Sequence, residues 1–168
     1  MGGESLIGRE LRELIRERRL PLKPKLIGVD DDSLTLTADA GEAVVMTPLD
    51  EESLAGARVA VLAGSRAGSA KALEILEKKP ETAVVDLTYA AEDEPAARLR
   101  APMVEPSGYE APAGTIHVIA HPAATALALF LLRLGSGARI HRSVAQIFEP
   151  ASERGQAGLD ELREQTVS

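Results

Sequence analysis

Ile116-His-Val-Ile-Ala-His-Pro-Ala-Ala-Thr-Ala-Leu-Ala-Leu-Phe-Leu-Leu-Arg-Leu134 predicts a buried strand that passes through a proline corner into an apolar helix. Pro122 suits the first turn of that helix, because its missing N–H is not needed there. In a reactive enzyme such a corner would hold a nucleophile, since a helix N-terminus lowers the pKa of a thiol. The residue at this position is Ala124, and the chain contains no cysteine. A capped helix start with a purely structural role is the alternative interpretation.

Buried strands and amphipathic helices alternate along the chain. Continuous apolar runs at Val59–Ala63 and Ala83–Leu87 alternate with helical faces at Ile7–Arg18 and Ser69–Leu76. This order predicts an α/β fold, with a mostly parallel sheet and helices on both faces. Further elements are expected as follows: strands at Leu26–Val29, Ser33–Thr37, Ala43–Met46 and Arg139–Phe148, a long connection over Thr88–Gly114, and a last helix from Leu159.

Composition places the chain among ordinary soluble domains. It has 168 residues, 45% hydrophobic and 27% charged, which is about one domain. The net charge of −7 argues against nucleic acid as a partner. Its longest apolar segment, Ala123–Leu132, is about half the length of a membrane span. No secretory signal opens the chain, so a cytoplasmic location and no membrane partner are expected.

A glycine-rich turn is predicted at the start of the chain. Gly2, Ser5 and Gly8 have the spacing of a Gly-x-x-Gly-x-x-Gly turn, with serine at the middle glycine. Such a turn lets the backbone approach a dinucleotide pyrophosphate at the N-terminus of the next helix. The helix follows, but no strand precedes the turn, and incidental glycines near a chain start are the alternative.

The proline corner resembles the aspartate-semialdehyde dehydrogenase family, in which a strand ends in Asn-Pro-Asn-Cys-Ser/Thr and the cysteine is the nucleophile. On that pattern Pro122 is kept, His121 and Ala123 replace the asparagines, and Ala124 replaces the cysteine. The resemblance implies a Rossmann-like NAD(P)-binding domain over residues 1–135 and the start of an α+β dimerisation domain over 136–168. It also implies that the first strand is missing and that the chain is truncated at both ends.

Other segments extend the resemblance. Gly64 and Ser65 resemble the family's second phosphate-side loop, although a plain turn with Ser65 as N-cap remains the alternative. Phe148–Leu162 resembles the start of the family's dimerisation domain, and Glu149 takes the place of the glutamine that positions the substrate. The resemblance therefore implies NADP or NAD as cofactor, a homodimer, and a dinucleotide site made by Gly2, Ser5, Gly8, Gly64 and Ser65; no metal site is expected.

Two details bear on the cofactor. Leu87-Thr88-Tyr89 replaces the family's Asn-Ser-Ser after Asp86, which weakens the expectation of cofactor contacts at that edge. Asp30-Asp31-Asp32 follows an expected strand, where an acidic residue binds a ribose 2′-hydroxyl and favours NAD; a solvated acidic turn is the alternative.

Three hypotheses about function follow. The preferred one is a catalytically inactive, cysteine-less relative that keeps a nucleotide-binding fold as a binding or scaffold subunit. Its support is that Ala123, Ala124 and Glu149 depart at chemical positions, whereas Gly8 and Pro122 preserve backbone geometry. The alternatives are a fragment of an active NADP-dependent aspartate-semialdehyde dehydrogenase and a purely structural fragment that dimerises without a ligand.

Overall fold

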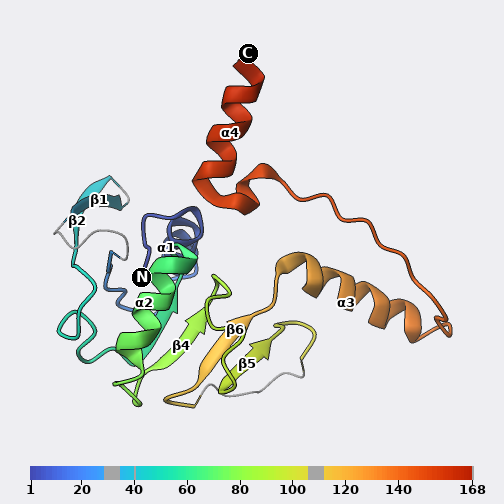
Figure 1. Cartoon of the computed structure of the whole chain (residues 1–168), viewed down its shortest axis with the longest axis horizontal. Coiled ribbons are helices and arrows are strands. Elements are labelled where there is room, and N and C mark those ends of the chain that lie inside the picture. Colours follow the sequence, from blue (N-terminus) through green and yellow to red (C-terminus); the bar gives the residue numbers. More distant parts are fainter. Residues whose placement is uncertain (29–34, 40, 106–111, 168) are drawn as a thin grey trace. The chain divides into compact units, whose positions relative to one another are not determined.

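A four-stranded parallel sheet is present in the computed structural model, which describes residues 1–28, 35–39, 41–105 and 112–167 (Figure 1). Its strands are β3 (Val59–Leu62), β4 (Ala83–Asp86), β5 (Ala97–Arg100) and β6 (Ile116–Ile119), in the order β3-β4-β6-β5. β3 pairs with β4 and β4 with β6, both in parallel. The Rossmann-like α/β expectation is thus confirmed.

Helix α1 (Leu6–Glu17) precedes the strands of this sheet in the sequence, and helix α2 (Arg66–Leu76) connects β3 to β4. Both begin at a serine whose hydroxyl accepts a backbone N–H of the first turn. The hydrophobic core gathers apolar side chains from the strands, α2 and the neighbouring segments: Ile27, Leu54, Ala60, Leu62, Ala72, Leu76 and Val84. Both helices and most of the strands are where the hydrophobic periodicity predicts them.

A small hairpin lies between α1 and β3 in the sequence. Strands β1 (Thr35–Asp39) and β2 (Glu42–Met46) pair antiparallel. After β2, Thr47 forms an isolated parallel bridge with Ile27. Of the expected strand at Leu26–Val29, the described residues Leu26, Ile27 and Gly28 include one bridged residue, Ile27, and Val29 lies outside the described residues. Asp30, Asp31 and Asp32 lie outside the described residues.

The chain divides into two compact units. The first comprises Met1–Leu99 and Ala111–Val118, and the second Arg100–Glu110 and Ile119–Ser168. Within the second unit, α3 (Pro122–Gly135) follows the proline corner, and η1 (Ala151–Arg154) leads into α4 (Gly155–Val167). The domain boundary expected after residue 135 stays a prediction.

Two expectations from the sequence are wrong. Arg139–Phe148 was expected as a strand, but it is irregular, because alternation alone does not make a strand and the described residues offer it no neighbouring strand. Thr88–Gly114 was expected as a plain connection, yet it contains β5, whose short polar sequence Ala-Arg-Leu-Arg hid it. The last helix begins at Gly155, four residues before the expected start.

Candidate functional site

The first residues of the chain run between β3 and Ile27. The amino group of Met1 donates to the carbonyl of Val61 at 2.8 Å, and the Met1 carbonyl accepts from the N–H of Ala63 at 3.1 Å. On the opposite side, Gly2 N–H donates to the Ile27 carbonyl at 3.0 Å. Burial lowers the pKa of the Met1 amino group, against a smaller opposing effect of Glu4. Met1 is thus held as the last residue of a strand would be.

The two glycine loops predicted from the sequence, one at Gly2–Gly8 and one at Gly64, contact each other in the first unit. Gly2 has a φ of +72°, and a Cβ added to it would lie 2.2 Å from the Cα of Gly64. A Cβ on Gly8 would lie 2.2 Å from the carbonyl oxygen of Gly2. Only glycine fits both places, for a different reason in each: Gly2 needs a left-handed backbone as well as space, while Gly8 needs space alone. The spacing of the motif is therefore explained by close backbone contacts.

Next to these glycines, a serine caps the N-terminus of each of the helices α1 and α2. The Ser5 hydroxyl accepts from the N–H of Gly8 at 2.9 Å and donates to the carbonyl of Ala63. The Ser65 hydroxyl accepts from the N–H of Gly68 at 3.0 Å. Because Ser5 also binds Ala63, the N-terminus of α1 is tied to the residues just before α2. Helix N-termini carry partial positive charge and unsatisfied N–H groups, the features that bind phosphate.

A buried carboxylate, that of Asp86, organises the loop after β4. Asp86 is fully buried. Its carboxylate accepts from the Thr88 N–H and hydroxyl, each at 2.7 Å, and from the Ala91 N–H at 2.8 Å. Next to Thr88, Tyr89 has a φ of +59°. Asp86 therefore shapes this loop from within. A single aspartate at the end of a strand was the only available signal.

The proline corner lies in the second unit. His121 is the N-cap of α3, and its Nδ1 accepts from the Ala123 N–H at 3.2 Å. Since Nδ1 is an acceptor, the ring carries its proton on Nε2, which lies 2.8 Å from a Glu153 carboxylate oxygen and 3.5 Å from Glu149. Ala124 is exposed in the first turn of α3. At this corner His121 contacts two carboxylates, and Ala124, three residues further on, is no nucleophile.

The predicted site residues fall into the two units, although Ala124, which lies within the domain expected over residues 1–135, belongs to the second unit. Gly2, Ser5, Gly8, Gly64 and Ser65 belong to the first unit, and Ala124 and Glu149 to the second. Glu153 could not be found from the sequence, because its pairing with His121 depends on the turn at η1. In the part of the chain that the structure describes, no three His, Asp or Glu side chains gather as metal ligands would.

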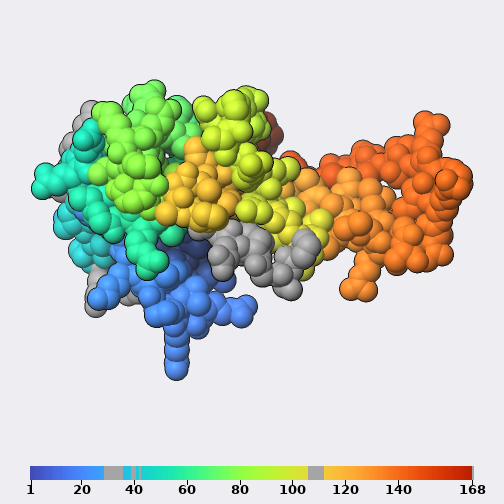
Figure 2. Space-filling model, turned by 90° about the horizontal axis from the view of Figure 1, so that it is seen from below, coloured from blue at the N-terminus to red at the C-terminus, as the bar shows by residue number. Residues whose placement is uncertain are grey.

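Among the described helices, none has both the length and the hydropathy needed to cross a bilayer. α3 is the most apolar of them in sequence, yet none of its residues is buried. Its exposed apolar side chains include Phe130, Leu132 and Leu134. In Figure 2, α3 and the segment that follows it are drawn in the deeper orange.

Comparison with known proteins gives a match in structure only. No family model and no curated protein sequence matches the chain. The chain is similar to two crystal structures of aspartate semialdehyde dehydrogenase II from Vibrio cholerae, one of them complexed with ASA. Their TM-scores are 0.73 for that complex and 0.77 for the other, with 19% and 20% identity. Each alignment covers 99% of this chain and 50% of the enzyme, so the chain spans about half of the enzyme's length. The chain has the fold of the N-terminal half of an aspartate semialdehyde dehydrogenase.

Proposed function

We propose that the chain binds NADP or NAD at the glycine loops and acts as a binding or scaffold subunit without dehydrogenase activity. One observation carries the proposal: the contact of Gly2 with Gly64 brings together the loops that lead into α1 and α2. A pyrophosphate needs close backbone approach and helix N-termini, and both are available there. The solved structures to which the chain is similar support the same assignment through their fold.

The proposed loss of activity rests on the second unit. The methyl group of Ala124 supplies neither a nucleophile nor a proton, although it lies in the first turn of α3, where a thiolate would be stabilised. Glu149 would repel an acidic substrate and lacks the N–H donors of a glutamine. The alternative is that the chain is part of an active NADP-dependent aspartate-semialdehyde dehydrogenase. Reduction of nicotinamide by the purified chain, dependent on both aldehyde and phosphate, would establish that alternative.

Calorimetric titration with NADP and with NAD tests the nucleotide part. The informative variants are at Ser65, because aspartate and asparagine both cap helices about as well as serine. Ser65→Asp would add a negative charge beside the bound phosphates, and we expect it to weaken binding about tenfold or more. Ser65→Asn keeps the cap without the charge, so it should bind as the parent does.

The outcomes separate the parts of the proposal. If the parent chain binds neither nucleotide, the dinucleotide site is wrong. If Ser65→Asp and Ser65→Asn bind equally well, the nucleotide lies elsewhere. Binding without any aldehyde-dependent reduction supports a binding subunit.

We further propose that the chain forms a homodimer through the second unit. Val144 and Phe148 are each 86% exposed, and Ile147 is 50% exposed, in a segment without regular structure. Covering such side chains would favour association. Sedimentation velocity tests this, because a monomer at all concentrations would contradict it. The cytoplasmic location expected from the sequence stays a prediction.

A further inference from the structure

Two loops leave the carboxyl edge of the sheet next to each other, one after β3 and one after β4. The two strands end level with each other, since Leu62 pairs with Asp86 in their parallel register. The Leu87 N–H then donates to the Leu62 carbonyl at 3.0 Å. Beyond this point an ion pair joins the loops, because Nη2 of Arg66 lies 2.7 Å from Oε1 of Glu92. The pair therefore connects the start of α2 to the loop after β4.

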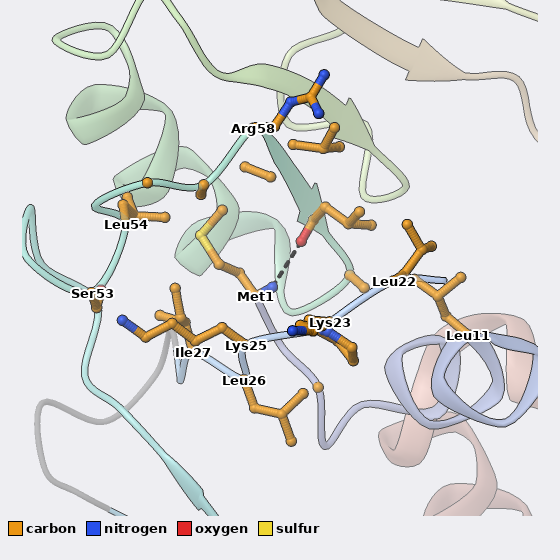
Figure 3. Close-up of a pocket in the computed structure, with 18 of the residues that line it drawn as sticks. Met1, Leu11, Leu22, Lys23, Lys25, Leu26, Ile27, Ser53, Leu54 and Arg58 are labelled. Carbon is orange, nitrogen blue, oxygen red and sulfur yellow. Dashed lines mark hydrogen bonds between the residues drawn. The ribbon is translucent and has the colours of Figure 1, made fainter. Parts of the chain in front are cut away.

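Arg66 adjoins the phosphate site proposed above. It is the first residue of α2 and directly follows the cap Ser65. Gly64, two residues before Arg66, packs against Gly2. Gly2 in turn follows Met1, whose amino group is hydrogen-bonded to β3 (Figure 3). Arg66 therefore begins the helix whose N-terminal loop contacts the loop before α1.

The position of Arg66 in its helix calls for an anion nearby. The N-terminus of a helix carries partial positive charge, so acidic side chains are favoured in its first turn and cations are not. The first turn of α2 contains no acidic residue, and neither does the first turn of α1. Arg66 thus adds a full positive charge to the partial charges of these helix N-termini. Among the residues that the structure describes, the anion paired with Arg66 is Glu92.

The pair with Glu92 is weak enough to be exchanged for another. The side chains of Arg66 and Glu92 are 58% and 48% exposed. Ion pairs at such exposure contribute little to stability, because water solvates both partners. An arginine binds a phosphate group through two parallel N–H donors, and such charged pairs are among the stronger hydrogen bonds. Glu92 can therefore hold Arg66 without preventing it from turning to a phosphate.

We propose that Arg66 binds the pyrophosphate of the dinucleotide and that Glu92 competes for Arg66 when the nucleotide is absent; this rests on the nucleotide site proposed above. On binding, the guanidinium exchanges the carboxylate of Glu92 for phosphate oxygens. Arg66 is then a binding residue, and Glu92 lowers the affinity by the free energy needed to separate the pair. The ligand group is the diphosphate that NADP and NAD share.

Calorimetric titration with NADP and with NAD tests the exchange. Arg66→Gln should weaken the binding of both nucleotides about tenfold or more, since both carry the pyrophosphate. Glu92→Gln should tighten the binding by up to about fivefold, because the competing carboxylate is gone. In the double variant most of this gain should disappear, because Glu92 competes only for Arg66.

Glu51→Gln is the matched control. Glu51 forms an exposed ion pair with Lys78 at 2.8 Å, and Lys78 lies just beyond the C-terminal end of α2. The substitution removes the same charge from a similar pair at the other end of the same helix. Glu51→Gln should therefore bind both nucleotides as the parent does.

The outcomes distinguish this proposal from the one on which it rests. If the parent binds neither nucleotide, the dinucleotide site is wrong and the role of Arg66 is wrong as well. If the parent binds and Arg66→Gln binds equally well, the site stands and the role of Arg66 is overturned. A loss confined to NADP would assign Arg66 to the 2′-phosphate and would also overturn it. If Glu92→Gln gains as much affinity in the double variant as alone, its effect is plain charge repulsion, and competition for Arg66 is overturned.

Discussion

The Gly8→Ala substitution in α1 has two opposing effects on the free energy of unfolding. Alanine is more favourable than glycine inside a helix by about 1 kcal/mol. Against this gain, a Cβ on Gly8 would lie 2.2 Å from the carbonyl oxygen of Gly2 and 2.9 Å from the Cα of Gly3. Both are backbone atoms, so no side-chain rotation relieves the contact, and overpacking of this kind costs up to about 3 kcal/mol. We expect the substitution to lower the free energy of unfolding by about 2 kcal/mol.

Gly135, the last residue of α3, is the matched control. A Cβ there would meet only the Ile140 side chain, at 4.0 Å, which is an ordinary contact. Gly135→Ala should therefore raise the free energy of unfolding by up to about 1 kcal/mol. Urea unfolding is best followed by far-ultraviolet circular dichroism, because the chain has no tryptophan. If Gly8→Ala is as stable as the parent or more so, the close packing of the glycine loop is refuted, and with it the reason for glycine at this position.

Three further predictions concern single groups. Asp86→Asn should lower the free energy of unfolding by about 2–3 kcal/mol in urea titrations, since its amide NH₂ would face the donors of Thr88 and Ala91; the exposed Asp93→Asn should have little effect. The free energy of unfolding should rise as pH approaches 8.0, the ordinary pKa of the Met1 amine, because the unfolded chain holds this proton more tightly than the folded chain does. Acetylating the amine should remove this increment, and equal pH profiles for acetylated and unmodified chains would contradict the argument. His121→Ala should cost about 1 kcal/mol through loss of the α3 cap, whereas His121→Asn should be nearly neutral; equal thermal shifts for the two variants would show that the cap contributes nothing.

Local patterns predicted the elements that depend on local interactions. The helix expected at Ile7–Arg18 is α1, displaced by one residue at each end, and the apolar run at Ala83–Leu87 contains β4. Arg139–Phe148 failed because a strand depends on a partner that lies elsewhere in the sequence. β5 was missed because its place beside β6 in the sheet, and not its own composition, makes it a strand.

The candidate site also contains residues that local patterns predict and contacts that depend on segments far apart in the sequence. The spacing of Gly2, Ser5 and Gly8 predicted a turn that leads into a helix, and Ser5 is the N-cap of that helix. Spacing could not show that Gly2 abuts Gly64, since that contact requires β3 to lie beside Met1. The contact of Glu153 with His121 was equally hidden, because it depends on the turn at η1, whereas the resemblance had already named Glu149.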